Sequence, residues 1–244
     1  SFYSSFFGDA PEAAKAREYL AGRGLGEEIL KDFGVGFAPS AWDTLLIKGQ
    51  QAGYSIPELL RTGLAQKNNK GGVYDRFRAR ITFPIRDARG RVVGFGARAT
   101  RDEQKPKYLN SAEGELFHKS EILYGIDRAR GPMAKAGRAV VVEGYTDVIA
   151  LHQAGFTEAV GVMGTSITEA QIAMLSATVD TIVLALDADA AGRKAMLRAQ
   201  QVAAGRSLRI LVVAMPAGVD PAEIATAEGG AETFRELVDA AVEL

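Results

Sequence analysis

The chain has 244 residues, of which 47% are hydrophobic and 24% are charged, and its formal net charge is −1. This composition excludes disordered, collagen-like and coiled-coil proteins. No apolar run approaches the roughly 18 residues of a membrane span, and the first residues lack a signal-peptide pattern. The absence of cysteine excludes disulfides, cysteine-ligated zinc and thiol catalysis within these residues, and the two histidines disfavour a Ser-His-Asp triad.

Helices with short connections are predicted for about the first 60 residues. Residues 10–20 have helix-forming composition, and the Gly-Arg-Gly sequence at 22–24 predicts the end of that helix. A second short helix is expected from about Gly26. Ser55 is expected to cap a third helix, with Pro57 in its first turn.

Residues 78–98 change to a period of two, which predicts a β-hairpin around the turn at residues 87–90. Its apolar face would carry Ile81, Phe83, Ile85, Val93, Phe95 and Ala97. On the opposite face Gly94 and Gly96 leave little side-chain bulk beside Arg98, so a backbone or a phosphate could approach closely. The alternative is a solvated sheet face with glycines that serve its twist.

From residue 138 onward, apolar strands alternate with helices. Strands are expected at residues 139–142, 159–163, 181–186 and 208–214, and helices at 145–154, after Thr168 and at 190–204. Continuous apolar strands in this alternation are typical of a buried parallel sheet with right-handed crossovers.

Charge is distributed unevenly between the region that contains the predicted hairpin and the region of alternating strands and helices that follows it. Residues 61–130 carry 16 lysines and arginines against 8 acidic residues, whereas residues 139–244 carry 6 against 14, with no lysine or arginine at 139–192. The pattern indicates either a polyanion-binding surface and a cation-binding one, or two domains with differently solvated faces.

Acidic residues follow the expected strands where the binding crevice of an open parallel sheet lies. They are Glu143, Asp147, Asp187, Asp189 and Asp220. Unpaired carboxylates at one edge repel each other, and a divalent cation such as Mg²⁺ or Mn²⁺ would neutralise them. Individually, Asp147 could complement a helix dipole, Asp189 could cap a helix, and Asp220 could be only a turn residue.

Two segments resemble the Toprim domain, which has a glutamate after strand one and an Asp-x-Asp motif after strand three. They are residues 142–151 (VEGYTDVIAL) and 186–195 (LDADAAGRKA). Other segments resemble, more narrowly, the RNA-polymerase core of the bacterial replicative primases (DnaG type). These are residues 75–78 (DRFR), 83–85 (FPI), 89–98 (RGRVVGFGAR), 106–111 (PKYLNS) and 117–120 (FHKS).

This resemblance implies an α/β fold. An N-terminal α+β subdomain with a basic surface, residues 1–133, would precede a Toprim domain, residues 134–244, whose parallel sheet is flanked by helices. It implies Glu143, Asp187 and Asp189 as catalytic metal-site acids, with Asp147 and Asp220 contributing. Mg²⁺ would be the cofactor, replaceable by Mn²⁺, with no zinc. The residues implied to face template and triphosphate are Arg23, Arg76, Arg78, Arg98, Lys107, Tyr108, Asn110 and Lys119.

The sequence departs from the family pattern at two positions. Ala188 stands in an Asp-Ala-Asp motif where the family usually has Asp-Gly-Asp, and both acids are kept. Ala222 stands where many members have a second acid after Asp-Pro, and Glu223 could substitute. The family's zinc module, helical remainder of the core and helicase-binding domain are not in this sequence, so a fragment of a longer protein is expected.

The implied function is DNA-directed synthesis of short RNA primers from ribonucleoside triphosphates on single-stranded DNA, by metal-assisted nucleotidyl transfer. The expected setting is the cytoplasm of a bacterium, at the replisome and not a membrane, with the replicative helicase bound only through the absent C-terminal domain. Glu143 could be a ligand or a general base. A Toprim-type nuclease and a non-catalytic single-strand- or nucleotide-binding module remain alternatives, and the latter would need neither Glu143 nor Asp187.

Overall fold

The structure, a computed structural model, describes residues 2–164, 166–186, 200 and 208–243. The chain divides into two compact units. The first comprises Ser1–Gly22, Gly26–Ile85 and Val92–His118, and the second comprises Arg23–Leu25, Arg86–Arg91 and Lys119–Leu244. The domain division expected between residues 133 and 134 stays a prediction. None of the described helices combines the length and apolarity needed to cross a bilayer.

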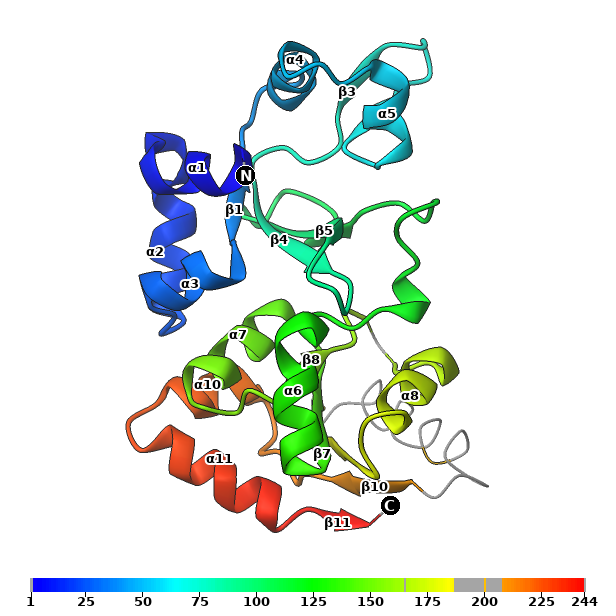
Figure 1. The fold of residues 1–244 in the computed structure, drawn as a ribbon. Coiled ribbons are helices and arrows are strands. Elements are labelled where there is room, and N and C mark those ends of the chain that lie inside the picture. Colours follow the sequence, from blue (N-terminus) through cyan, green and yellow to red (C-terminus); the bar gives the residue numbers. More distant parts are fainter. Residues whose placement is uncertain (1, 165, 187–199, 201–207, 244) are drawn as a thin grey trace. The chain divides into compact units, whose positions relative to one another are not determined.

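The first unit is built on an antiparallel sheet with helices before its first strand (Figure 1). The strand order is β1-β4-β5-β6, with β1 antiparallel to β4 and β5 antiparallel to β6. The strands are β1 (Gly36–Ala38), β4 (Arg80–Arg86), β5 (Val92–Ala99) and β6 (Tyr108–Asn110). The preceding helices are α1 (Phe2–Asp9), the 3₁₀ turn η1 (Pro11–Ala13), α2 (Ala14–Gly22) and α3 (Glu27–Phe33), as the N-terminal pattern predicted.

A second group of elements in this unit surrounds a small core of its own, formed by Leu46, Leu59 and Ala65. The elements are α4 (Thr44–Gln51), α5 (Ile56–Arg61) and the antiparallel ribbon of β2 (Ala65–Lys67) and β3 (Val73–Asp75). The predicted cap of α5 is confirmed: the Ser55 hydroxyl accepts from the Glu58 N–H, and the Glu58 carboxylate accepts from the Ser55 N–H at 2.7 Å.

The predicted hairpin is present, but the face opposite its apolar residues is not a solvated one. Arg80 and Thr82 are 4% and 0% exposed. A Cβ on Gly94 would lie 2.9 Å from the ring of Phe117 and 3.2 Å from the Ser111 Cβ. The space beside Gly94 is therefore filled by the side chains of Phe117 and Ser111.

The second unit contains the predicted parallel sheet. Its strand order is β11-β10-β9-β7-β8, and the pairs β7–β8, β7–β9 and β9–β10 are parallel. The strands are β7 (Arg138–Val142), β8 (Ala159–Gly161), β9 (Thr181–Leu184), β10 (Arg209–Val212) and β11 (Val242–Glu243). The antiparallel edge strand β11 was not anticipated, because two exposed residues carry no strand periodicity.

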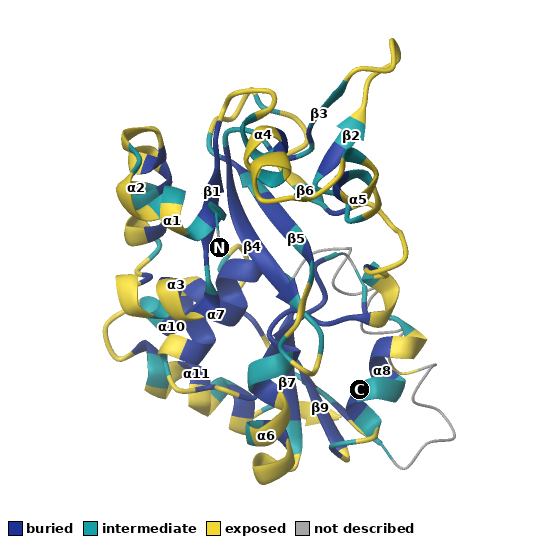
Figure 2. Ribbon diagram, turned by 45° about the horizontal axis from the view of Figure 1, so that its top comes forward, coloured by how far each residue is buried: buried dark blue, intermediate teal, exposed yellow. Residues whose placement is uncertain are grey.

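Helices flank this sheet, whose central strands are buried (Figure 2). They are α6 (Ile126–Ala136), α7 (Tyr145–Gln153), α8 (Glu169–Ser176), α10 (Pro221–Thr226) and α11 (Gly230–Asp239). Apolar residues of α6 and α8, such as Met133 and Ile172, join the core of the sheet. The Thr168 cap of α8 is confirmed, since its hydroxyl accepts from the Gln171 N–H. The helix expected at 190–204 falls almost entirely outside the described residues.

Candidate functional site

The strand order creates a topological switch point between β7 and β9. The chain passes from β7 to its neighbour β8 on one side, while β9 lies on the other side. Ligands of open α/β sheets bind at the carboxyl ends of the strands at such a point. Glu143 follows β7 directly, and the Ala185 N–H donates to the Val141 carbonyl at 2.9 Å, which keeps the two strand ends together. Asp187 and Asp189, two and four residues after Ala185, lie outside the described residues.

The end of β8 reaches the same edge of the sheet. The Met163 N–H donates to the Glu143 carbonyl at 3.0 Å. Met163 has a φ of 57°, in the left-handed region that residues other than glycine rarely adopt. Strained backbone of this kind clusters at functional sites, so it supports the importance of this edge.

Asp147 lies in the first turn of α7 and is 6% exposed. Its Oδ2 accepts a hydrogen bond from the Gly144 N–H at 3.0 Å, so the carboxylate stabilises the start of the helix, as the dipole alternative anticipated. A Cβ on Gly144 would lie 2.7 Å from this same oxygen. Glycine at 144 therefore lets Asp147 take up this position.

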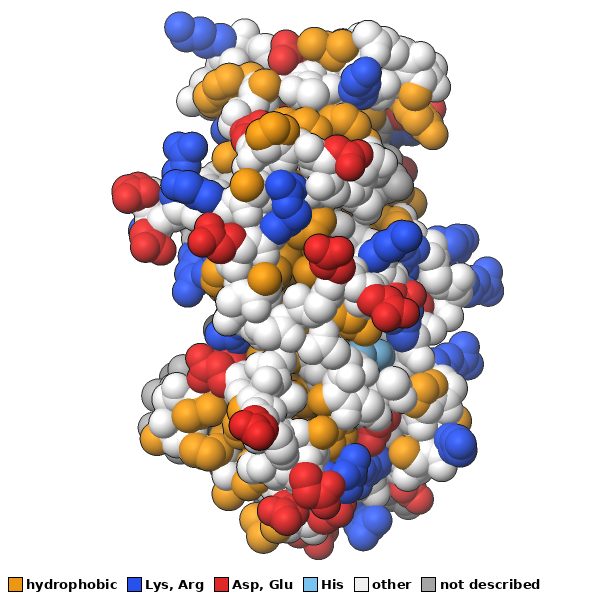
Figure 3. Space-filling view, turned by 90° about the vertical axis from the view of Figure 1, so that its left-hand side faces the viewer, with side chains coloured by type: hydrophobic (Ala, Val, Ile, Leu, Met, Phe, Trp, Pro, Cys, Tyr) orange, Lys and Arg blue, Asp and Glu red, His pale blue; other side chains and the backbone are white. Residues whose placement is uncertain are grey.

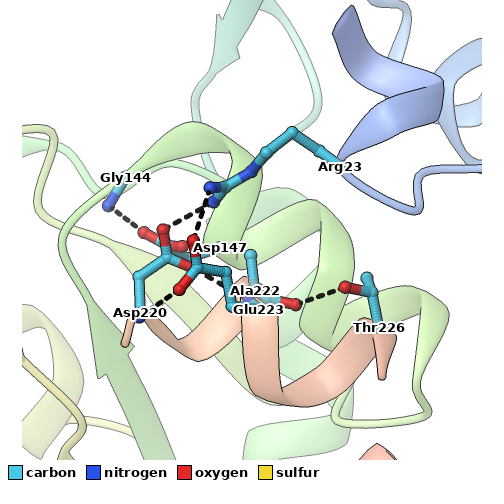
Figure 4. Close-up of polar contacts among 7 residues, drawn as sticks. All are labelled: Arg23, Gly144, Asp147, Asp220, Ala222, Glu223 and Thr226. Atoms are coloured by element: carbon cyan, nitrogen blue, oxygen red, sulfur yellow. Dashed lines mark hydrogen bonds and ion pairs between the residues drawn. The ribbon is translucent and has the colours of Figure 1, made fainter. Parts of the chain in front are cut away.

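Asp220 caps α10 and also forms an ion pair (Figure 4). Its Oδ1 accepts from the Glu223 N–H at 2.8 Å, and its Oδ2 lies 2.6 Å from Nη2 of Arg23. Nη1 of Arg23 lies 3.4 Å from Oε1 of Glu223. The sequence offered no basic neighbour for these acids, and the fold supplies one from near the N-terminus. Arg23 is thus paired with two carboxylates. The family resemblance instead implied that Arg23 faces the template and the triphosphate.

Ala222, which stands where an acid was expected, is 1% exposed, and its carbonyl accepts from the Thr226 hydroxyl at 2.7 Å. Both carboxylate oxygens of Asp220 are engaged in these contacts. Among the described residues, no three His, Asp or Glu side chains form a group that could hold a metal ion. A complete site at this edge would therefore need Asp187 and Asp189.

Lys119 brings a cation to this region of the second unit. It begins the 3₁₀ turn η2 (Lys119–Glu121), and a Cβ on Gly164 would lie 2.9 Å from its Nζ. Gln171, 1% exposed, donates from Nε2 to the carbonyls of Ile122 at 2.8 Å and Lys119 at 3.2 Å. Gln171 was not singled out from the sequence, although the Thr-x-x-Gln spacing of the capping box was a usable signal.

In the first unit, two expected template residues lie on paired strands, and a third, Lys107, directly precedes β6. Arg98 of β5 lies opposite Tyr108 of β6, and Lys107 has its Nζ 5.9 Å from the Tyr108 ring. Tyr108 is 48% exposed, and Arg98 stacks on Tyr19, with 3.7 Å between its guanidinium carbon and the ring centroid.

On the face shown in Figure 3, basic and acidic side chains are interspersed, so this face carries no continuous basic stripe.

Arg76 and Arg78 hold parts of the first unit together. Arg76 donates from Nε and Nη2 to the Asn110 carbonyl, at 3.1 and 2.7 Å, and from Nη1 to Gln66 at 3.2 Å. Burial lowers the pKa of its guanidinium. Arg78 donates to the Asp75 carbonyl at 2.6 Å and lies over Trp42, a contact that sequence reasoning missed.

A Toprim-type sheet with a glutamate after its first strand, joined to a separate α+β unit, defines the class of protein. The family model described as "Toprim-like" matches residues 140–225, and the model described as "DNA primase catalytic core, N-terminal domain" matches residues 2–130. The chain belongs to the DnaG-type DNA primase family, which confirms the resemblance and the fold class read from the sequence.

Curated relatives and solved structures agree with this assignment. The DNA primase of Deinococcus radiodurans is 43% identical to this chain over 240 residues, and the match covers 93% of this chain and 42% of that protein. The DNA primase of Escherichia coli K12 is 41% identical over 239 residues, and the match covers 96% of this chain and 40% of that protein. The chain therefore spans about two-fifths of the length of these relatives. A primase domain from Pseudomonas aeruginosa superposes with a TM-score of 0.91 at 42% identity, covering 99% of this chain and 76% of that one. A DnaG primase catalytic domain bound to single-stranded DNA superposes with a TM-score of 0.87 at 38% sequence identity, and the match covers 99% of this chain and 76% of that one.

Proposed function

We propose that the protein containing this chain synthesises short RNA primers on single-stranded DNA by nucleotidyl transfer from ribonucleoside triphosphates. The observation that carries the proposal is the position of Glu143 at the β7/β9 switch point, in a chain of the DnaG family. The residues that follow β9 lead directly to Asp187 and Asp189. Acids at such a crevice suit chemistry on phosphate groups.

Glu143, Asp187 and Asp189 would hold the divalent cation, Mg²⁺ or Mn²⁺, because carboxylate oxygens are the donors that these ions prefer. When bound, the cation supplies stabilisation of charge on the phosphate oxygens and lowers the pKa of the attacking hydroxyl. Asp147 adds negative charge nearby while it stabilises the start of α7. Asp220, whose two oxygens accept from Arg23 and Glu223, would contribute charge only.

The basic side chains of each unit have separate roles in this proposal. Lys119, beside the Gly164 backbone, would bind triphosphate oxygens. Arg98 and Tyr108, on the paired strands β5 and β6, and Lys107, just before β6, would contact the template, with Tyr108 stacking on a base. Asn110 continues this surface along β6. Binding of single-stranded DNA by a related catalytic domain supports a template as the ligand. The helicase contact and the cytoplasmic replisome setting are part of the same proposal.

The metal assignment is tested by thermal unfolding with increasing MnCl₂ or MgCl₂. Binding at a hundredfold excess over the dissociation constant stabilises a protein by about 2.7 kcal/mol. Glu143→Gln, and Asp187→Asn combined with Asp189→Asn, should remove this stabilisation, while Glu228→Gln, an exposed acid of the same unit, should keep it. If the double variant still shows the full metal-dependent increase, the ion binds elsewhere.

The activity is tested with the full-length protein in a primer-synthesis assay on single-stranded template. RNA product that is lost in Glu143→Gln supports the primase. Cleavage of the template without RNA product would instead identify a Toprim-type nuclease. Unchanged template binding with no product from the unmodified protein would identify a non-catalytic binding module.

A further inference from the structure

The capping box at the start of α8 is formed by Thr168 and Gln171. The Thr168 hydroxyl accepts from the Gln171 N–H at 3.1 Å, and Oε1 of Gln171 accepts from the Thr168 N–H at 3.0 Å. These two bonds satisfy free N–H groups at the helix start, which is the ordinary function of such a box. Both side chains have further donors, and these bind a second segment of the chain.

The remaining donors of the box all bind the segment that begins at Lys119. Oγ1 of Thr168 donates to the Ser120 carbonyl at 2.5 Å. Nε2 of Gln171 donates to the Lys119 carbonyl at 3.2 Å and to the Ile122 carbonyl at 2.8 Å. A threonine hydroxyl has one hydrogen and a glutamine amide has two, so every side-chain donor of the box is used on this segment.

The same segment is fixed at its other end by β8. The Tyr124 N–H donates to the Gly161 carbonyl at 2.9 Å, and the Gly161 N–H donates to the Tyr124 carbonyl at 3.0 Å. The Tyr124 side chain is 1% exposed and packs edge to face on Tyr145, with ring centroids 4.9 Å apart. The backbone that carries Lys119 is therefore held between β8 and the start of α8.

The presence of glutamine at position 171 follows from these contacts. Two other capping boxes of the described residues have glutamate as their second member, with exposed hydrogen bonds: Ser55 with Glu58, and Asp220 with Glu223. Gln171, by contrast, is 1% exposed. A glutamate there could still accept from the Thr168 N–H, but it would have no hydrogen for a carbonyl and would bury a charge. Glutamine thus serves the contact with the Lys119 segment as well as the helix cap.

We propose that Thr168 and Gln171 are positioning residues, which hold Lys119 where its ammonium group can bind the triphosphate of the incoming nucleotide. The proposal rests on the function proposed above, since it needs Lys119 to contact the triphosphate. A Cβ on Gly164 would lie 2.9 Å from Nζ of Lys119, so this side chain extends along the backbone that follows β8. Lysine has a flexible four-carbon stem, and a fixed backbone reduces the freedom that it loses on binding.

Two substitutions separate the helix cap from the positioning contact. Gln171→Glu keeps an acceptor for the cap but removes both donors, and Thr168→Asp keeps a good N-cap but removes the donor to Ser120. In the primer-synthesis assay of the full-length protein, each should raise the KM for ATP about fivefold, which corresponds to about 1 kcal/mol. The kcat should change little, because a phosphate contact present before and during the reaction contributes to binding alone. Thr168→Ser, which keeps the hydroxyl, should restore the KM.

A double substitution distinguishes positioning from a merely structural effect. If Gln171 acts through Lys119, Gln171→Glu should raise the KM no further in a protein that already carries Lys119→Ala. Two effects that multiply would overturn the proposal. Ser55→Asp, in the exposed capping box of α5, is the matched control and should leave the KM unchanged. If Gln171→Glu does not fold, Thr168→Asp with and without Lys119→Ala decides, because Thr168 is only partly buried.

The failure of the positioning role can be told apart from the failure of the proposed function. Primer synthesis with a raised KM in Lys119→Ala, but an unchanged KM in Thr168→Asp and Gln171→Glu, would overturn the positioning role and leave the proposed function intact. An unchanged KM in Lys119→Ala would also overturn the positioning role, because Lys119 would then not contact the triphosphate. No RNA product from the unmodified protein would overturn both.

Discussion

Arg23 and Asp220 are 197 residues apart in the sequence, yet Nη2 of Arg23 lies 2.6 Å from Oδ2 of Asp220. The side chains are 21% and 27% exposed, so the ion pair is partly shielded from water. Gly24, with a φ of +73°, follows directly, and a Cβ there would lie 2.6 Å from the Thr226 Cβ. The short segment after α2 thus fits closely against α10 and brings a cation to an otherwise acidic region.

Replacing Arg23 by alanine should lower stability by about 1 kcal/mol, because Asp220 and Glu223 would lose their cationic partner. For a chain of this size this corresponds to a decrease in Tm of about 2–4 °C. A double-mutant cycle with Asp220→Asn measures the pair itself. Arg235→Ala, which breaks an exposed pair with Glu232, should cost less than about 0.5 kcal/mol. Strictly additive effects of Arg23→Ala and Asp220→Asn would contradict a coupled pair.

Gly144→Ala should destabilise the chain by about 1–2 kcal/mol, since the new Cβ would lie 2.7 Å from Asp147 Oδ2 and displace the carboxylate from the first turn of α7. Urea unfolding gives the change in free energy. Gly8→Ala in α1 is the control, because nothing lies within 4 Å of a Cβ at that position, and it should be neutral or slightly stabilising. A neutral Gly144→Ala would show that Asp147 can cap the helix from another position.

His152 should make stability depend on pH near neutrality. It is 8% exposed, its Nε2 donates to the Ala159 carbonyl at 2.9 Å, and burial is the main cause that lowers its pKa below 6.5. The unfolded chain therefore binds the proton more readily than the folded one. The contribution to stability is complete above pH 6.5 and is lost as the pH falls through the lowered folded pKa.

Urea unfolding at pH 7.5 and at lower pH values measures this loss, whose slope is at most about 1.4 kcal/mol per pH unit for one proton. In His152→Gln the decrease in stability below pH 6.5 should be smaller than in the unmodified chain. His118→Gln, at a half-exposed position, is the control for the loss of a histidine. An identical profile in His152→Gln would assign the pH dependence to other groups.

Gln171→Leu should lower the free energy of unfolding by about 2 kcal/mol, because the buried carbonyl of Ile122 and the part-buried carbonyl of Lys119 would lose their donor. The displaced η2 turn should also weaken triphosphate binding, since Lys119 would no longer be fixed beside Gly164. Gln50→Leu, at an exposed position of α4, should change neither property. Urea unfolding and a nucleotide titration give the two quantities. Unaltered nucleotide affinity in a destabilised Gln171→Leu would limit this residue to a structural role.

The sequence by itself determined the parallel sheet, the hairpin and the caps at Ser55 and Thr168. These features depend on local periodicity and on hydrogen bonds between residues three positions apart, which are visible in the chain order. The position of Glu143 at a strand end was predictable for the same reason. The family motifs at 142–151 and 186–195 identified the Toprim domain.

Only the tertiary structure decided which partner each polar group finds. Arg23 meets Asp220, Gln171 holds Lys119, Phe117 fills the space above Gly94, and Arg78 lies on Trp42. Such pairs join residues far apart in the sequence, and no periodicity encodes them. They form because packing brings the chain segments together and because buried polar groups must then be satisfied by whatever lies within hydrogen-bond reach.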